Sequence, residues 1–515
     1  MKLIKQILCF ALAVLMLLSV VACGGGPAAG GNNDDDDDDD DVDDDNATTT
    51  EDRIDELPDI DMNKEEIIIR SWTQSVNQNS FKAERDGDVI NNAVYDRNAA
   101  LEKRLNCVVT VNENIGQPGS MGELDELTNL AGQKSYHLVT NASYVITTAA
   151  VQGFFIDLAK QERIMLQKAY YDDGYNHALS AGTRQYLVTG KITLSWYRYQ
   201  VVTMFNRNLF KQKGIEYPYQ TVLDGNGYAG GWTLAKQMEV ANLMYADLNQ
   251  DGKYDVNDQY GFYHFVGSGS SQTDGYMSAW QLTLVEKNAE NYFQVNGAYE
   301  PTPWVSAVNE FLDLAGAVGS YVSDEIDNNV VSNKFAAGEA GMITFRMYGV
   351  EQDAMVSLSR DKEGYGIIPL AKDDEDQTEY NAYVQDQVLL FGIPNTMKDN
   401  DRLYATHFLE ALASESYNVT VPAYYEKALT KKYVIDEPSK AMIQIIDSQI
   451  VVDPTNVWTS YFNLDTTVLR QVYAEDKKIN DLLAEKMAGG TMQTSVDKLN
   501  DLLKKLDEDL TAIGE

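Results

Sequence analysis

Apolar and polar positions in the folded part of the chain form segments that predict strands and helices in alternation. Short apolar runs predict a buried first strand at 66–70 and two further strands at 107–111 and 136–140. Between them, apolar residues recur at helical spacing over 93–105 and near 124–131. Strands that alternate with helices are typical of βαβ units. The sequence therefore predicts an α/β fold in which doubly wound sheets are flanked by helices.

Local signals predict further details of this region. Thr233 precedes a helical run and has a side chain suited to capping its first turn, so a helix is expected to begin there. Asn296 and Gly297 predict the turn of a hairpin over 292–299. About 450 residues follow Asp61, which is too many for one hydrophobic core, so two lobes are expected.

The N-terminus has the pattern of a secretory signal. Lys2 and Lys5 precede an apolar run of about 16 residues, shorter than the roughly 20 that a membrane span needs. Residues 1–22 are therefore predicted to be a signal peptide; an uncleaved helix is the alternative. Ala22 directly before Cys23 resembles the lipobox of bacterial lipoproteins. That resemblance implies that Cys23 carries a lipid and anchors the mature chain at the extracellular face of the membrane.

Residues 23–60 carry little apolar surface. Glycines open this segment, and aspartates fill 34–41 and 43–45. Their charges repel one another, so we expect a disordered tether that spaces the folded region from the membrane. A weak cation-binding segment is the alternative. The whole chain has a formal charge of −38, which disfavours nucleic-acid binding.

The three cysteines have separate explanations. Cys9 lies in the signal and Cys23 in the lipobox, so Cys107 is the one thiol expected in the mature chain and no internal disulfide is expected. Cys107 opens an apolar run, which favours burial. No second apolar stretch is long enough to cross a bilayer, so membrane contact is expected through the lipid alone.

Six segments of the folded region resemble, in this order, family 1 extracellular solute-binding proteins, the group that includes the maltose-binding type. They are Tyr136–Val139, Gly153–Leu158, Met204–Ile215, Gly231–Thr233, Phe335–Met342 and Gly366–Pro369. The resemblance implies two α/β lobes joined by a hinge of two or three crossovers, which close over a ligand. It also implies that the chain, expected to be a monomer, delivers this ligand to the permease subunits of an ABC importer.

The same resemblance implies where the chain divides. Residues 61–200 would form the first part of lobe one, and 201–372 the first part of lobe two. Residues 373–430 would return to lobe one, and helices in 431–515 would be shared by both lobes.

Residues 247–258 have the spacing of a calcium loop. Oxygen-bearing side chains stand at positions 1, 3, 5, 9 and 12, glycine stands at position 6, and a backbone carbonyl is available at position 7. In order, the expected ligands are Asp247, Asn249, Asp251, the Lys253 carbonyl, Asp255 and Asp258. The last is usually Glu, and Asp there resembles the loop of dockerin modules. The sequence predicts a structural Ca²⁺ site, with a metal-free polar turn as the alternative.

Ligands of doubly wound sheets lie beyond the carboxyl ends of the strands, so loop residues are the candidates for the binding site. An aromatic ring can lie against the apolar face of a sugar while amide and guanidinium groups hold its hydroxyls. For each aromatic side chain, packing in the core is the alternative. The candidates are Trp72, Asn141, Tyr144, Trp196, Arg346, Tyr348 and Trp458.

The sequence does not support an enzymatic function. A glycosidase needs two opposed carboxylates, and no motif points to such a pair. The four histidines are scattered, and neither a Gly-x-Ser-x-Gly motif nor a phosphate-binding loop occurs. We therefore expect a binding protein without enzymatic activity, whose ligand is a polar solute, a sugar or an oligosaccharide. A sensor or surface glycan-binding protein of the same fold is the alternative.

Overall fold

The computed structural model describes residues 54–512 except 74–78, 116–135, 224–230, 268–269, 362, 398, 434–435, 463–467 and 475–477. The predicted signal peptide, Cys23, most of the predicted tether and the helix expected near 124–131 lie outside the described residues.

The first sheet contains the three strands that the apolar runs predict. Its order is β13-β3-β1-β2, with β1 at Glu65–Thr73, β2 at Cys107–Ile115, β3 at Leu138–Ala142 and β13 at Leu389–Gly392. The central strand β1 pairs in parallel with β2 and β3, as expected for βαβ units, whereas β13 is antiparallel to β3. The strand β13 belongs to a segment that returns late in the chain, which gives it the opposite direction.

The second sheet has the order β10-β7-β11-β6-β12. Parallel pairs join β7 to β10 and β11, and antiparallel pairs join β6 to β11 and β12. Both sheets are therefore mixed, the first through β13 and the second through β6. The bounds are Val201–Asn206 for β6, Tyr260–Phe265 for β7, Ser320–Ser323 for β10, Ala340–Arg346 for β11 and Tyr365–Ile368 for β12.

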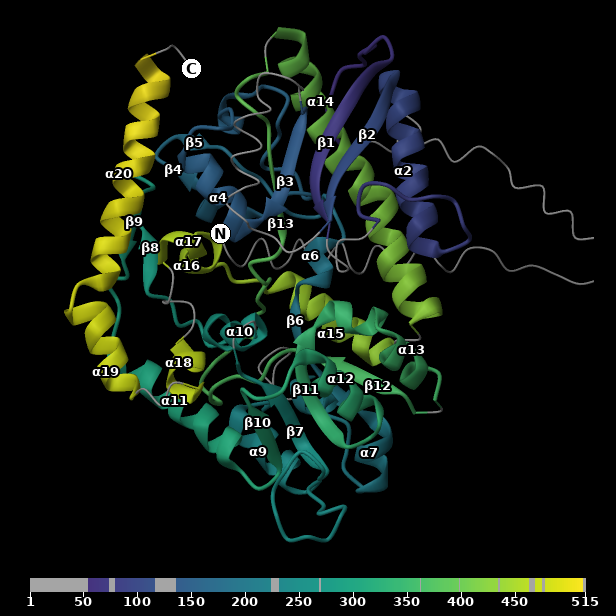
Figure 1. Cartoon of the computed structure of the whole chain (residues 1–515), viewed down its shortest axis with the longest axis vertical. Coiled ribbons are helices and arrows are strands. Elements are labelled where there is room, and N and C mark those ends of the chain that lie inside the picture. The colour runs from purple at the N-terminus through teal and green to yellow at the C-terminus, as the bar shows by residue number, and fades with distance from the viewer. Residues whose placement is uncertain are drawn as a thin grey trace, which may run out of the picture. The chain divides into compact units, whose positions relative to one another are not determined.

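Helices flank each sheet (Figure 1). Beside the first sheet, α2 begins after Asp88, whose carboxylate accepts the N–H groups of Ile90 and Asn91, and it ends at Asn106 with a left-handed φ of 47°. In the second lobe, α9 begins after Thr233, whose hydroxyl accepts the Lys236 N–H at 3.2 Å, so the predicted cap is confirmed. The helices that flank the sheets are α2 (Val89–Leu105), α4 (Ser143–Val151), α7 (Arg207–Gln212), α9 (Leu234–Asn242), α11 (Pro301–Gly316), α12 (Asn328–Ala336), α13 (Asp353–Ser359), α14 (Asp399–Glu415) and α15 (Glu437–Ser448).

The remaining elements are short, apart from the last helix. Figure 1 shows this helix, α20, reaching from the side of β4 and β5 down to α19, so the end of the chain passes both sheets. The other helices are α5 (Asp173–Leu179), α6 (Ser195–Arg198), α8 (Tyr219–Leu223), α10 (Ser271–Ala279), α16 (Pro454–Val457), α17 (Thr459–Phe462), α18 (Val468–Ala474), α19 (Ile479–Leu483) and α20 (Thr491–Ala512). The 3₁₀ turns are Leu158–Lys160 and Met347–Glu351, and the π-helical turns are Ser416–Thr420, Ala423–Lys432 and Ala484–Ala488. Two small hairpins pair β4 (Ser180–Ala181) with β5 (Arg184–Gln185) and β8 (Val285–Lys287) with β9 (Phe293–Val295).

The hairpin predicted over 292–299 was placed one strand too late. Its strands are β8 and β9, and the turn between them is built by Asn288, whose side chain accepts the N–H groups of Glu290 and Tyr292, and by Asn291 with φ of 61°. Asn296 instead follows β9 and donates its side-chain amide to the Thr283 carbonyl. An Asx turn at Asn288, and not the Asn296-Gly297 pair, therefore reverses the chain in this hairpin.

Three segments run side by side between the two sheets. Val201 donates its N–H to the Tyr383 carbonyl at 3.0 Å, and Gln385 donates to the Tyr199 carbonyl at 3.0 Å. On the other side of the middle segment, Ala382 donates its N–H to Gln449, and its carbonyl accepts the N–H of Val451, each at 2.9 Å. The sheets are therefore joined by three hydrogen-bonded crossovers, at 199–201, 382–385 and 449–451.

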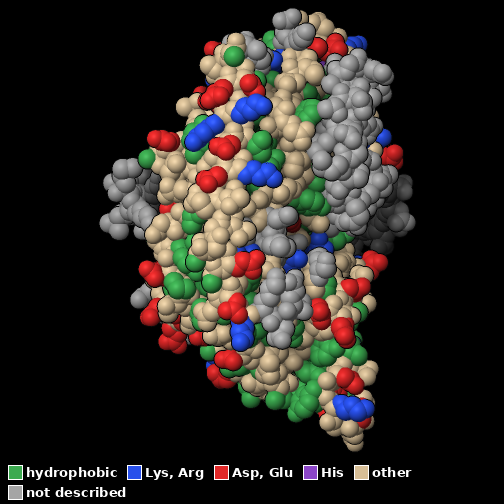
Figure 2. Space-filling model, turned by 60° about the vertical axis from the view of Figure 1, so that its left-hand side comes forward, with side chains coloured by type: hydrophobic (Ala, Val, Ile, Leu, Met, Phe, Trp, Pro, Cys, Tyr) green, Lys and Arg blue, Asp and Glu red, His purple; other side chains and the backbone are tan. Residues whose placement is uncertain are grey.

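Apolar side chains lie mainly in the core, and charged side chains lie mainly at the surface. Cys107 is 5 % exposed, so its predicted burial is confirmed. On the face in Figure 2, Lys and Arg side chains lie singly or in small groups among Asp and Glu. Among the described helices, none is both long and apolar enough to cross a membrane.

Candidate functional site

The best candidate for a functional site lies beside the crossovers. There, the ends of β3 in the first sheet and β11 in the second sheet lie near the segment around Asp386. Helix α4 begins directly after β3, and Ser143 donates both its N–H and its hydroxyl to the Asp386 carbonyl, at 3.0 and 2.7 Å. From the second sheet, Arg346 ends β11 opposite Val201 of β6. The segment around Asp386 is therefore fixed to lobe one, beside the end of a lobe-two strand.

Arg346 is a half-buried guanidinium without an ion pair. It forms no hydrogen bond or salt bridge with any residue that the structure describes, and its guanidinium carbon lies 5.9 Å from the centre of the Tyr199 ring. Burial lowers its pKa, while Tyr199, Tyr348 and Asp386 act in the opposite direction. A charged group of this kind has five N–H donors to offer to a ligand.

Asp386 and Tyr199 carry polar atoms that are likewise unsatisfied within the described part of the chain. The Asp386 Oδ1 atom and the Tyr199 hydroxyl oxygen are buried and lack hydrogen-bond partners there. Burial raises the pKa of Asp386 to about 6, opposed by Arg470 and Arg346. Buried polar atoms without partners are rare, and a binding site is one of the places where they are tolerated.

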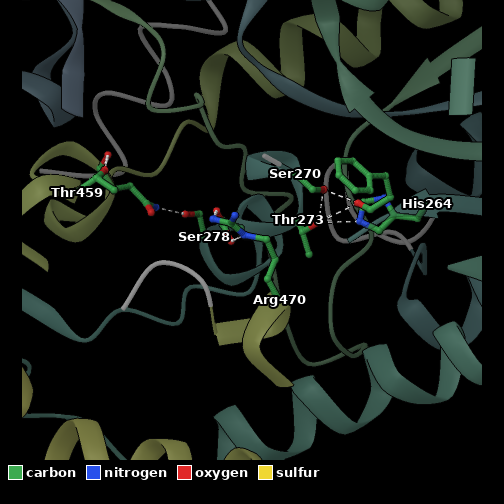
Figure 3. Close-up of polar contacts among 9 residues, drawn as sticks. His264, Ser270, Thr273, Ser278, Thr459 and Arg470 are labelled. Atoms are coloured by element: carbon green, nitrogen blue, oxygen red, sulfur yellow. Dashed lines mark hydrogen bonds and ion pairs between the residues drawn. The ribbon is translucent and has the colours of Figure 1, made fainter. Parts of the chain in front are cut away.

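An ion pair of Arg470 and Asp274 interacts electrostatically with Asp386. Arg470 of α18 donates two hydrogen bonds to the Asp274 carboxylate, at 3.0 and 2.7 Å, and Asp274 belongs to α10 (Figure 3). Burial raises the pKa of Asp274 to about 7, although Arg470 opposes this shift. The charges of Asp274 and Arg470 thus compensate each other, and each of the two side chains also interacts electrostatically with Asp386.

Further hydrogen bonds hold α10 in place (Figure 3). At its start, Thr273 bonds the His264 ring at 2.9 Å and the Ser270 hydroxyl at 2.8 Å. At its end, Asn456 donates to the Ser278 hydroxyl at 3.2 Å. The helix that carries Asp274 is thus attached both to β7 of the second sheet and to the late helix α16.

Three predicted site residues lie near Asp386. Tyr144, half-buried in α4, has a raised pKa because of burial and the nearby Asp386 charge. Tyr348 and Arg346, also half-buried, interact electrostatically with one another. Asn141 is 9 % exposed, and its side-chain oxygen accepts the Ala142 N–H at 2.7 Å. The structure thus brings Tyr144, Arg346 and Tyr348 to one region, from both sheets.

The three predicted tryptophans pack inside the protein, each 1 % exposed. Trp72 is the next-to-last residue of β1 and lies within the core of the first sheet. Trp196 donates its indole N–H to the Asp447 carboxylate at 3.2 Å, and Trp458 donates to the Ala178 carbonyl at 2.8 Å. In the conformation described, each ring has the packing role that was the alternative for it, and ligand contacts by these residues stay predictions.

Sequence reasoning did not select Tyr199, Asp386, Asp274 or Arg470. Tyr199 lies three positions after the candidate Trp196, but nothing in the sequence around the other three is distinctive. Asp274 and Arg470 are 196 positions apart, and only the folded chain brings them together. Asp386 lies between two glutamines, so it does not interrupt an apolar run and gave no signal in the sequence.

The loop at 247–258 is rich in turns made by its own side chains. Asp247 accepts the N–H groups of Gln250 and Gly252 at 2.6 and 2.9 Å, and Gly252 has the positive φ, 73°, that its position in the motif requires. Asn249 accepts the Asp251 N–H at 3.0 Å. These hydrogen bonds curl the first half of the loop around its own carboxylates.

In the second half of the loop, carboxylate oxygens also accept hydrogen bonds, and one aspartate is buried. Asp251 accepts the Lys253 N–H at 2.9 Å and Asp255 accepts the Asn257 N–H at 2.8 Å. Asp258 is fully buried, with Oδ2 accepting the Tyr245 hydroxyl at 3.1 Å and Oδ1 lacking a hydrogen-bond partner within the described residues. As the loop stands, no three acidic, histidine or cysteine side chains of the described residues are grouped closely enough to hold a metal ion.

Comparisons with known proteins connect this arrangement to one fold. No protein-family model matches the sequence, and no curated protein is similar to it. The solved structure of the sugar-binding protein MalE from Xanthomonas citri is similar over 87 % of this chain and 99 % of its own, with a TM-score of 0.55 and 12 % identity. An ABC transporter solute-binding protein from Thermotoga lettingae, bound with α-D-tagatose, covers 85 % of this chain and 100 % of its own, with a TM-score of 0.52 and 14 % identity.

A family 1 extracellular solute-binding protein from Bifidobacterium longum subsp. infantis is similar over 86 % of this chain and 99 % of its own, with a TM-score of 0.50 and 12 % identity. Likeness at such low identity establishes the fold. The chain therefore has the two-lobe α/β fold of solute-binding proteins, and the predicted fold class is confirmed.

Proposed function

We propose that this chain is an extracellular solute-binding protein that captures a sugar or oligosaccharide between its lobes and delivers it to an ABC importer. The observation that carries the proposal is the placement of Arg346 and Asp386. Both have unused hydrogen-bonding capacity, and both lie where strand ends of the two sheets meet beside the crossovers. A polar ligand would satisfy these groups, and the similar solved proteins include sugar-binding ones.

Closure of the lobes would supply the signal for transport. The three crossovers at 199–201, 382–385 and 449–451 form a compact hinge, and a ligand that contacts groups from both lobes favours the closed state. No covalent chemistry is required of the chain, which acts as a binding protein and a monomer. The permease subunits of the importer would recognise the closed form.

Binding is tested by isothermal titration of the full chain with a panel of mono- and oligosaccharides. We expect at least one sugar to bind and raise the melting temperature, since a ligand of the folded state stabilises it. Arg346→Ala should weaken that binding at least tenfold, whereas Arg85→Met, which removes an exposed ion pair with Asp96, should not change it. Absence of binding across the panel, or an unchanged affinity of Arg346→Ala, would refute the proposal.

Attachment through Cys23 is a separate part of the proposal. The lipobox-like Ala22-Cys23 pair supports it, and the aspartate-rich segment that follows suits a spacer. Cells that express the full chain should retain it in the membrane fraction, and Cys23→Ser should lose the lipid mass from the mature N-terminus. A Cys23→Ser chain with the lipid mass of the wild type would contradict this assignment.

We also propose that Ca²⁺ binds the loop at 247–258. A carboxylate oxygen that accepts one backbone N–H retains a second lone pair for a cation, so the loop's own turns do not exhaust its ligands. The buried Asp258, with one unsatisfied oxygen, and the glycine at position 6 support the proposal. Ca²⁺ should raise the melting temperature of the chelated protein, and Asp251→Asn should weaken this effect. Equal melting temperatures with calcium and with chelator would rule the site out.

A further inference from the structure

Four charged side chains form a group at the candidate site, which we call the junction cluster. Its members are Arg346, Asp386, Asp274 and Arg470. Asp386 interacts with both guanidinium groups, and Asp274 interacts with Arg470 and Asp386. Two cations and two carboxylates therefore balance one another, and the cluster has no net charge when all four are ionised.

The members of the junction cluster differ in how much of their hydrogen-bonding capacity is unused. Asp274 and Arg470 are joined by two hydrogen bonds, at 2.7 and 3.0 Å. Arg346 makes no hydrogen bond or ion pair within the described residues, and Asp386 keeps its Oδ1 atom without a partner. The cluster therefore contains guanidinium donors and one negatively charged acceptor atom that are not used within the described residues.

A ligand that matches these groups must both donate and accept. Neighbouring hydroxyls of a sugar do so, because one can accept from the guanidinium while the next donates to the carboxylate. A carboxylate or phosphate group can accept from Arg346, but it has no proton for Asp386. Its negative charge would also lie close to that of Asp386, in a half-buried site where repulsion is weakly screened.

We infer that Arg346 and Asp386 select a neutral sugar over its acidic counterpart. Arg346 donates a hydrogen bond to one sugar hydroxyl, and the neighbouring hydroxyl donates a hydrogen bond to Asp386. This inference rests on the proposed function, because it concerns the same site. Tyr144 and Tyr348 lie beside the pair and are half-buried, so their rings are available to the body of the sugar. Arg470, which is hydrogen-bonded to Asp274, also interacts electrostatically with Asp386 and opposes the rise of its pKa.

The inference is tested with matched pairs of sugars, in which a neutral gluco-, galacto-, manno- or xylo-oligosaccharide is compared with the same backbone carrying a uronate. For any pair that binds the full chain at pH 7.5, isothermal titration should show the neutral sugar at least tenfold tighter. Asp386→Asn should reduce this preference at least fivefold, because the repulsion of the uronate disappears and the cluster gains a net positive charge.

Two control measurements keep the result interpretable. Arg85→Met should leave the preference unchanged, because its exposed ion pair with Asp96 lies on α2, apart from the cluster. Each variant is checked for wild-type circular dichroism. A uronate that binds as tightly as its neutral partner, or an unchanged preference in Asp386→Asn, would overturn the inference while sugar binding itself stands. Absence of binding by every sugar would instead refute the proposed function.

Discussion

Removal of one partner from the buried Asp274–Arg470 pair is expected to cost far more stability than removal of an exposed ion pair. The side chains are 4 % and 20 % exposed, and the shortest N–O distance is 2.7 Å. Two unit charges about 4 Å apart attract by about 4 kcal/mol at an effective dielectric constant of about 20. Arg470→Met leaves the Asp274 carboxylate buried without its partner, so we expect a loss of about 3–5 kcal/mol in the free energy of unfolding at pH 8.5.

The size of this loss should depend on pH in a defined direction. Burial already raises the pKa of Asp274 to about 7, and removal of Arg470 takes away the group that opposes the shift. At pH 6, Asp274 in the variant can therefore take a proton and escape part of the penalty. The loss at pH 6 should be smaller than the loss at pH 8.5.

Urea unfolding followed by tryptophan fluorescence measures both losses. Lys236→Met is the matched control, because Lys236 and Glu239 form an ion pair at the surface, with side chains 39 % and 63 % exposed. The double change Asp274→Leu with Arg470→Leu should recover most of the loss, since no charge is left unpaired. A loss below about 1 kcal/mol at pH 8.5, or one equal to that of Lys236→Met, would refute the reasoning.

Three other predictions concern single positions. Burial raises the pKa of Asp386 to about 6, so its contribution to the free energy of unfolding is greatest below the unfolded-state pKa of 3.8 and is lost as pH rises through 6. From pH 5 to pH 8 the free energy of unfolding of the wild type should fall by about 1.5 kcal/mol more than that of Asp386→Asn. Parallel pH profiles of the two proteins would contradict this. Gly261→Ala should destabilise by about 3 kcal/mol, because its Cβ would clash with the Ala241 carbonyl oxygen. The added Cβ of Gly231→Ala meets no atom of the described residues within 4 Å and should be nearly neutral; similar melting temperatures for both variants would argue against the predicted clash. Thr233→Ala should cost about 1 kcal/mol by removing the cap of α9, and Thr233→Ser should restore it, so an equal loss in both variants would exclude a capping effect.

The sequence alone determined the class of fold and several of its local features. Apolar runs located β1, β2 and β3. A strand buried on both faces needs a continuous apolar stretch, as in β3, whereas β2 is an edge strand in which Val108 is 47 % exposed. The Thr233 cap was also predictable, since capping depends on the residues of a single turn. Where two local signals competed, as at Asn288 and Asn296, the sequence did not show which one formed the turn of the hairpin.

The tertiary structure decided what each candidate residue does. Trp196 and Trp458 looked like ligand-stacking rings, yet their indole N–H groups bond Asp447 and the Ala178 carbonyl, 251 and 280 positions away. The junction cluster likewise joins α10, β11, a crossover and α18, which are far apart along the chain. Burial and electrostatic balance depend on these long-range neighbours, and periodicity in a sequence carries no information about them. For this reason chain length predicted two lobes and the family resemblance implied a hinge, but only the folded chain brought Asp386 near both Arg346 and Arg470.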